Sequence, residues 1–175
     1  MMSRLHFPAL LRNACAGAML AALCTQPALA GDAKTTNVKL RIGVAFTETI
    51  RPSDSTSCPG LIGEISGTGY STELGAVGIR STDCFVPDPT GTTLKFFTNP
   101  RVTLTTLGGD EIWGTYEGTA TGAPLPIISI SANLMIAGGT GRYVNASGTA
   151  SIEGIENIGS APAVGVLVIS GKLSY

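Results

Sequence analysis

Residues 38–46 have the sequence VKLRIGVAF, and this stretch decides the fold class. Apolar side chains occupy every second position, while Lys39 and Arg41 stand between them. Side chains of a β-strand point alternately to the two faces of a sheet, so this alternation predicts a strand with one buried face. The pattern therefore indicates a sheet that is covered on one side only.

Similar strand patterns recur along the rest of the chain. They predict further strands over 61–70, 73–83, 92–98, 101–107, 111–120, 128–136, 143–152 and 164–175. Turn-forming clusters separate these segments, among them Gly108-Gly109-Asp110, and no segment has a convincing helical pattern. Eight or nine short strands joined by short turns predict an all-β fold, a closed antiparallel up-and-down barrel that leaves no sheet edge exposed.

The first thirty residues have the features of a secretory signal. Arg4 and Arg12 precede or flank a short Ala-rich apolar stretch, and Ala28-Leu29-Ala30 has the small-x-small pattern of a cleavage site. A membrane anchor is the alternative, but a spanning helix needs about 20 apolar residues. We therefore expect a signal peptide over 1–30, cleavage after Ala30, and one barrel domain over 31–175.

Composition excludes several classes of function. The chain is 43% hydrophobic and 13% charged, which is too little charge for a disordered acidic tail or a basic nucleic-acid binder. Cleavage after Ala30 removes His6, the only histidine. Ser-His-Asp and Cys-His catalysis and histidine-based zinc sites would then be excluded. We expect no metal and no cofactor, and any catalysis would rest on Glu, Asp, Lys, Arg or Tyr.

Cys58 and Cys84 are the two cysteines that remain after cleavage. An even number of cysteines in an exported chain favours a disulfide, which here would tie the ends of the hairpin formed by 61–70 and 73–83. A reactive or metal-binding thiol pair is the alternative, but the spacing is far from Cys-x-x-Cys. We expect a structural bridge and export to the periplasm or the extracellular space.

Charged residues within the predicted strands are the candidates for a binding site. Glu73 and Arg80 would form the polar part of a cavity if they pointed into the barrel, and a buried carboxyl group could have a raised pKa and act as an acid. The favoured alternative is that such residues face solvent. Trp113 and Tyr116 have opposite parity in their strand, so we expect one of them to face the core.

Several glycine-rich motifs carry a family resemblance. Residues 138–143, GGTGRY, followed by small residues at 146, 148 and 150, resemble a segment of the allene oxide cyclase and dirigent-like barrels. Residues 67–75, 114–118 and 171–175 are similar to motifs of secreted bacterial proteins of that barrel type. The resemblance implies a fold rather than an activity, and no catalytic residue carries over. Those proteins usually have His where this chain has Glu73.

Three functional hypotheses follow. The leading one is an exported, non-enzymatic barrel that binds a small apolar molecule. A cyclase- or dirigent-like enzyme that guides a reactive intermediate in the barrel cavity is the second. A small outer-membrane barrel is the third, because the last strand alternates and ends in Tyr175. We expect neither nucleic-acid nor membrane partners, and the resemblance implies a homo-oligomer, a trimer by analogy.

Overall fold

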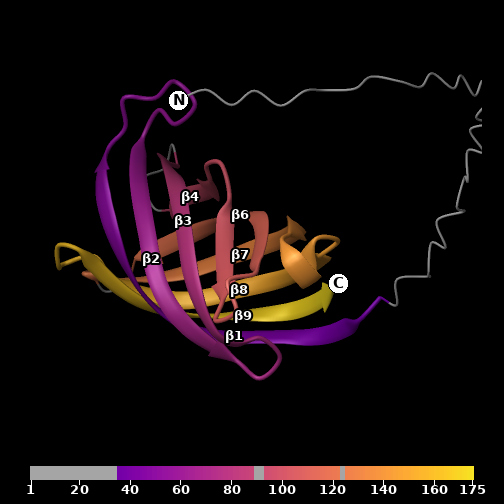
Figure 1. Ribbon diagram of the computed structural model, residues 1–175. Coiled ribbons are helices and arrows are strands. Elements are labelled where there is room, and N and C mark those ends of the chain that lie inside the picture. Colours follow the sequence, from indigo (N-terminus) through magenta and orange to yellow (C-terminus); the bar gives the residue numbers. More distant parts are fainter. Residues whose placement is uncertain (1–34, 89–92, 123–124) are drawn as a thin grey trace, which may run out of the picture. The chain divides into compact units, whose positions relative to one another are not determined.

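The computed structural model describes residues 35–88, 93–122 and 125–175 (Figure 1). The expected signal peptide and its cleavage site after Ala30 lie outside the described residues. The strands are β1 (Asn37–Pro52), β2 (Leu61–Ser71), β3 (Gly75–Pro87), β4 (Thr93–Thr98), β5 (Val102–Thr106), β6 (Glu111–Gly122), β7 (Ile127–Gly139), β8 (Ser147–Asn157) and β9 (Ala163–Ser174). The described part contains one short 3-10 helix, η1 (Gly141–Tyr143), and no helix with the length and apolarity of a membrane span.

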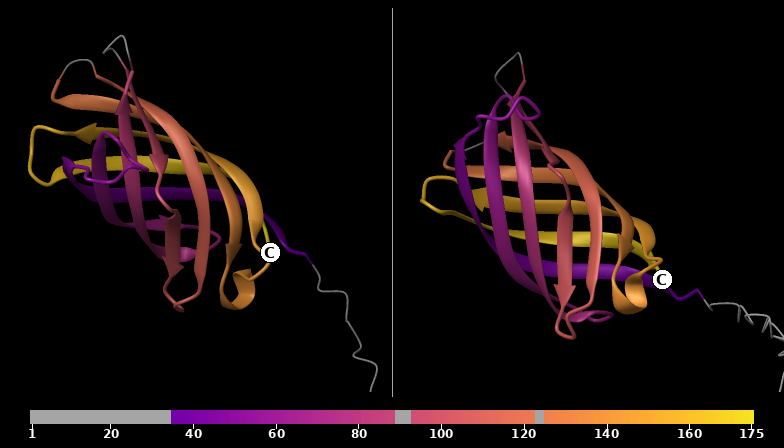
Figure 2. Two further views of the ribbon diagram at one scale, coloured as in Figure 1. Left: turned by 90° about the horizontal axis from the view of Figure 1, so that it is seen from above. Right: turned by 45° about the horizontal axis from the view of Figure 1, so that its top comes forward.

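The strands form a closed antiparallel barrel (Figure 2). With the exception of the pair β4 and β5, strands that follow one another along the chain pair with each other around the barrel. The first and last strands, β1 and β9, also pair, with Ile42 opposite Ile169, and this pairing closes the barrel. The short strands β4 and β5 each pair with both β3 and β6, and residues 99–101 separate β4 from β5. Together they take the place of one strand, so the nine strands form an eight-stranded barrel. The predicted all-β up-and-down barrel is confirmed.

Alternation along the strands places the apolar side chains inside the barrel. In β1, Leu40, Ile42 and Val44 are buried, whereas the intervening charged side chains are exposed. Burial of apolar surface contributes about 25 cal/mol per Å² and is the main favourable contribution to folding. Tyr116 is the aromatic side chain of β6 that faces this core, as the parity of that strand predicted.

The segment that follows β7 differs from the prediction. The sequence predicts a strand over 143–152, but β8 begins only at Ser147. Val144 is 63% exposed and Tyr143 is fully buried. The physical reason is a turn: Gly141 adopts φ +52, which favours glycine, and the chain then forms η1. The ring of Tyr143 packs against that of Tyr175 with 4.7 Å between centroids, so η1 is held against the residue that follows β9.

The predicted disulfide is present. Cys58 lies in the loop between β1 and β2 and is bonded to Cys84 on β3, with a Cα–Cα distance of 5.5 Å. Both half-cystines are fully buried. The bridge therefore fixes the β1–β2 loop to the third strand at the end of the barrel opposite η1.

Candidate functional site

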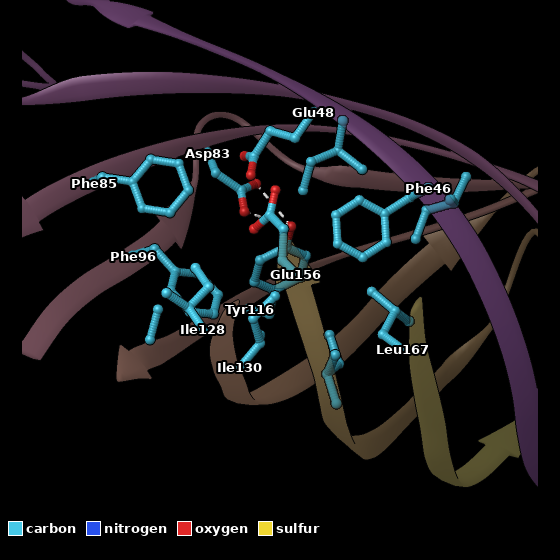
Figure 3. A pocket seen from close by; sticks show the side chains of 14 residues that line it. Phe46, Glu48, Asp83, Phe85, Phe96, Tyr116, Ile128, Ile130, Glu156 and Leu167 are labelled. Carbon is cyan, nitrogen blue, oxygen red and sulfur yellow. Dashed lines mark hydrogen bonds between the residues drawn. The ribbon is translucent and has the colours of Figure 1, made fainter. Parts of the chain in front are cut away.

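A pocket lies inside the barrel, toward the end where β1 and β8 finish and β7 and β9 begin (Figure 3). The cavity is small, with a volume of about 30 Å³. Most of its wall is apolar, from Phe46, Ile65, Ile79, Phe85, Phe96, Ala120, Ile128, Ile130, Ile152 and Leu167. Apolar walls with a few convergent polar groups are typical of small-molecule sites.

The polar part of the wall consists of three carboxyl groups and one phenol. Glu48 comes from β1, Asp83 from β3, Glu156 from β8 and Tyr116 from β6. The three acids are only 2%, 2% and 3% exposed, respectively. Figure 3 shows their carboxyl groups turned toward one another from three different strands. Acidic side chains are rarely buried without a positive partner, so this cluster is the chemically unusual feature of the molecule.

Asp83 is held by two hydroxyl groups. The Tyr116 hydroxyl donates to it, with Oη 2.7 Å from Oδ1 and 2.8 Å from Oδ2, and the Ser81 hydroxyl donates to Oδ1 at 2.7 Å. Burial raises the pKa of Asp83 to about 6, although these two hydrogen bonds favour the ionised form and oppose the increase. Burial and the neighbouring Asp83 charge raise the pKa of Tyr116 well above its ordinary value, so its hydroxyl remains a donor.

Glu48 and Glu156 form a proton-sharing pair. Burial raises the pKa of Glu48 to about 10, and its hydrogen bond with Glu156 and the charge of that group add to the increase. Burial also raises the pKa of Glu156. Glu48 therefore keeps its proton at neutral pH and donates it to Glu156.

One oxygen atom in each of these two carboxyl groups lacks a partner. Oε1 of Glu48 and Oε1 of Glu156 are buried and make no hydrogen bond within the described part of the chain. A buried polar atom without a partner costs about 1–3 kcal/mol, and such atoms usually have a bound water or ligand as their partner. The two oxygens therefore mark the place where a bound molecule would be held.

Glycines on the inner faces of the strands make room for this arrangement. A Cβ at Gly63 of β2 would collide with Oε1 of Glu48 and with the ring of Phe85. At Gly165 of β9, a Cβ would collide with the ring of Phe46. The absence of side chains at these inner positions lets the Glu48 carboxyl group and the Phe46 ring occupy the barrel interior.

The two residues proposed from the sequence do not line this pocket. Glu73 lies exposed in the turn between β2 and β3, and Arg80 is exposed on the outer face of β3. They therefore do not supply the polar part of the barrel cavity. A role of Glu73 and Arg80 in ligand binding stays a prediction.

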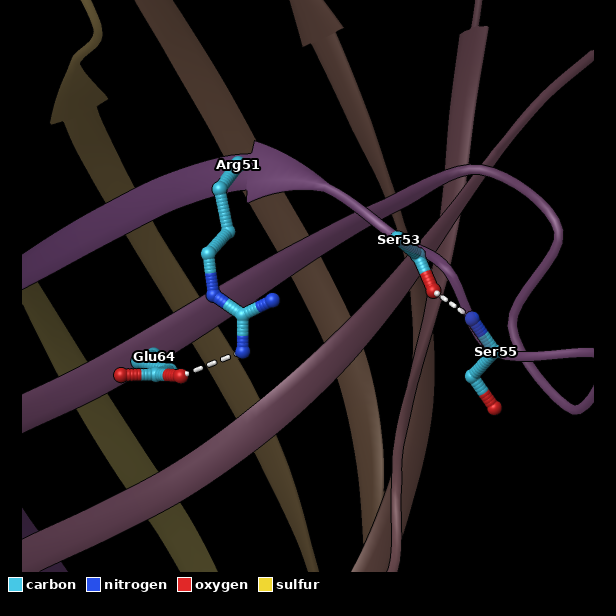
Figure 4. Close-up of polar contacts among 4 residues, drawn as sticks. All are labelled: Arg51, Ser53, Ser55 and Glu64. Atoms are coloured by element: carbon cyan, nitrogen blue, oxygen red, sulfur yellow. Dashed lines mark hydrogen bonds and ion pairs between the residues drawn. The ribbon is translucent and has the colours of Figure 1, made fainter.

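The expectation that charged strand residues face solvent holds for Arg51 of β1 and Glu64 of β2. Figure 4 shows Arg51 donating to Glu64 at 2.8 Å, with both side chains about half exposed. In the same view, the Ser55 N–H donates to Ser53 Oγ in the loop that follows β1. An exposed ion pair of this kind contributes about 0–1 kcal/mol, so it belongs to the solvated surface and not to the site.

The sequence did contain a signal for the buried acids. Glu48 follows Phe46 by two positions, Asp83 follows Ile79 by four and Glu156 follows Ile152 by four, so each acid shares the parity of buried apolar residues. Sequence reasoning ended the first strand too early and placed no acid on an inward position. The signal was an acidic residue at a position of the strand that alternation assigns to the buried, apolar face.

The cluster does not have the arrangement of a metal site. In the three described ranges, no group of three or more His, Cys, Asp or Glu side chains is placed to hold a metal ion. The chemistry that these residues can perform is hydrogen bonding and proton exchange, because a protonated Glu48, which donates to Glu156, lies beside the carboxylate of Asp83.

Comparison with known proteins supports the fold. No protein-family model and no curated protein sequence matches this chain. Among solved structures, the pterocarpan synthase dirigent protein GePTS1 is similar, with a TM-score of 0.50 and 12% sequence identity. The similarity covers 90% of this chain and 99% of that protein's chain. The chain thus has a dirigent-like barrel fold.

Proposed function

We propose that the protein binds a small, mainly apolar molecule inside the barrel, with the molecule's polar atoms facing Glu48, Asp83 and Glu156. The observation that carries this proposal is the pair of buried, unpartnered carboxyl oxygens at an otherwise apolar pocket. Apolar walls supply hydrophobic contact, and the free oxygens select molecules that can hydrogen-bond to them. The similarity to a dirigent protein supports a role in binding or guiding a molecule inside the barrel.

The proposed place of action is outside the cytoplasm. The Cys58–Cys84 disulfide supports export, because disulfides persist in oxidising compartments. The inward apolar side chains of β1, set against outward charged ones, support a barrel surrounded by water, since outer-membrane barrels have an apolar outer face. The bacterial origin, the periplasmic or extracellular location and the homo-oligomer expected by resemblance stay predictions.

The buried acids favour an enzyme as the second candidate. A neutral Glu48 beside an ionised acid provides a proton donor and an acceptor in one water-poor pocket, which is what acid-assisted closure or guiding of a reactive intermediate requires. To separate the two candidates, molecules found to bind are incubated with the protein, recovered and analysed by mass spectrometry and chiral chromatography. Unchanged molecules support a binding protein, and altered ones support the enzyme.

Binding itself is tested by filling the pocket. Residues 31–175 with the disulfide intact are screened against small apolar alcohols, phenols and amines by two-dimensional NMR. We expect shifts in the amide signals of Glu48, Asp83 and Glu156, and expect Ala120→Leu, which fills the pocket wall, to abolish them. Thr119→Leu, one position away on the exposed face of β6, is the matched control. The proposal is wrong if no compound shifts the pocket signals, or if both variants bind as the parent does.

A further inference from the structure

The side chains that line the pocket carry negative charge and no positive charge. Its polar groups are Glu48, Asp83, Glu156 and Tyr116, and no Lys, Arg or His is among the lining residues. The hydroxyl group of Tyr116 already donates to Asp83. What the site lacks is therefore hydrogen-bond donors and positive charge, and these are what a ligand would have to bring.

A neutral ligand would meet this need only in part. One hydroxyl group could donate to one of the two free oxygens, Oε1 of Glu48 or Oε1 of Glu156, and would leave the other without a partner. An ammonium group has three N–H donors and a positive charge, so it could satisfy both oxygens and also compensate the charge of the cluster. Resting on the proposed function, we infer that the ligand is an organic cation, a slender primary amine in its protonated form.

The walls and the size of the pocket agree with this ligand class. The rings of Phe46, Phe85 and Phe96 surround the cluster, and aromatic faces attract cations (Figure 3). The cavity volume of about 30 Å³ is enough for roughly two waters, at about 10–15 Å³ each. An ammonium group fits such a space, whereas the alkyl chain attached to it would require the aromatic side chains to move apart, and a ring would require a larger movement.

The bound cation would compete with protons. The titratable groups that face the site are Glu48 from β1, Asp83 from β3, Tyr116 from β6 and Glu156 from β8. In the empty pocket, the raised pKa values of the acids mean that protons neutralise part of the cluster. A cation that replaces such a proton releases it to solvent. Affinity for an amine should therefore increase as the pH rises from 5 to 8, while affinity for a neutral alcohol should change little.

The experiment compares two probes of equal length, hexylammonium chloride and 1-hexanol. A primary amine resembles a lysine side chain and is protonated throughout this pH range. Both probes are titrated at pH 5, 6, 7 and 8 and followed by the NMR signals of the pocket residues. We expect hexylammonium to bind at least tenfold more tightly than 1-hexanol at pH 7, and calorimetry in two buffers of different ionisation enthalpy should show proton release.

Variants of the buried acids test whether these residues cause the preference for hexylammonium over 1-hexanol. Glu156→Gln and Asp83→Asn should each weaken hexylammonium binding about tenfold and leave 1-hexanol binding unchanged. Glu64→Gln, on the exposed face of β2, is the control and should leave both affinities unchanged. If one acid variant fails to fold, the comparison of the two probes on the parent protein still decides the question.

The two proposals fail in different ways. If 1-hexanol binds in the pocket as tightly as hexylammonium, the inference of a cationic ligand is overturned while small-molecule binding stands. If neither probe shifts the pocket signals but another neutral compound from the screen does, the cationic ligand is again overturned. If no compound of any class shifts them, water is the partner of the free carboxyl oxygens and both proposals are overturned.

Discussion

The hydroxyl group of Tyr116 on β6 lies 2.7 Å and 2.8 Å from the two carboxyl oxygens of Asp83 on β3. The two strands lie on either side of the position shared by β4 and β5, so this hydrogen bond joins them through the barrel interior. Asp83 is the acid of the cluster that accepts hydrogen bonds from two hydroxyl groups. The bond from Tyr116 stabilises the ionised form of Asp83 and so opposes the increase in its pKa that burial causes.

Removal of this hydroxyl should destabilise the protein. In Tyr116→Phe, Asp83 keeps only the Ser81 hydroxyl as a donor, and we expect the free energy of unfolding to fall by about 1–3 kcal/mol. The pKa of Asp83 should also rise above its value in the parent protein. Urea unfolding at pH 7 and NMR titration of the Asp83 carboxyl carbon measure the two effects. Tyr70→Phe, at an exposed tyrosine, should change neither quantity.

Stability should decrease as the pH rises. The folded state holds a proton on Glu48 up to about pH 10 and on Asp83 up to about pH 6, whereas the unfolded carboxyl groups release theirs at ordinary pKa values of 4.5 and 3.8. The contribution of these protons to stability is therefore complete at low pH. It is lost as the pH rises from 4.5 to about 10 for Glu48 and from 3.8 to about 6 for Asp83. One proton corresponds to about 1.4 kcal/mol per pH unit.

The variant Glu48→Gln tests whether Glu48 causes this decrease of stability with rising pH. Above pH 6, the retained proton of Glu48 should dominate the decline, and its replacement by a neutral amide should flatten the curve of unfolding free energy between pH 6 and 9. Glu64→Gln, in the exposed pair with Arg51, should leave the slope of the parent. Urea unfolding at each pH provides the curve. A parent protein whose stability rises from pH 5 to 8 would contradict the assignment of a neutral Glu48.

Gly63 should not tolerate a side chain. In Gly63→Ala, the added methyl group would collide with the Glu48 carboxyl group and the Phe85 ring, and overpacking of this kind costs about 1–3 kcal/mol. Gly43→Ala is the control on β1, because a Cβ there meets no atom within 4 Å. Thermal unfolding should show a lower melting temperature for the first variant only. Equal melting temperatures would mean that Glu48 does not occupy the space beside Gly63.

The disulfide should stabilise both the barrel and its pocket. Cys58 and Cys84 are 26 residues apart, and closing a loop of this length contributes about 3–4 kcal/mol in the chain-entropy model. Cys58→Ser with Cys84→Ser should lower the unfolding free energy by that order. Because Cys84 lies between Asp83 and Phe85, ligand binding should weaken as well. Detection of two free thiols in the natively isolated protein would contradict the bridge.

The fold was more accessible to sequence reasoning than the site. Alternation of apolar and polar residues along strands such as β1 reports directly on which face is buried, and a closed barrel is the arrangement that covers one face of every strand. The burial of Tyr143 and the exposure of Val144 were not predicted, because a turn at Gly141 interrupts the alternation. Strand periodicity carries no information about such local changes of direction.

The site was missed because charge was taken as evidence of exposure. Glu73 and Arg80 were proposed as candidates, yet both are exposed, whereas Glu48, Asp83 and Glu156 lie inside. Their burial depends on partners from distant strands, such as Tyr116 for Asp83, and on inner glycines such as Gly63. Which strands become neighbours follows from the whole barrel, so no local pattern states that three acids will meet.

The ring contact between Tyr143 and Tyr175 joins the turn between β7 and β8 to the residue that follows β9. It lies at the end of the barrel opposite the Cys58–Cys84 disulfide, so each end of the molecule has its own cross-link between distant segments. Reduction of the disulfide should therefore loosen one end of the barrel and leave the packing of η1 at the other end intact.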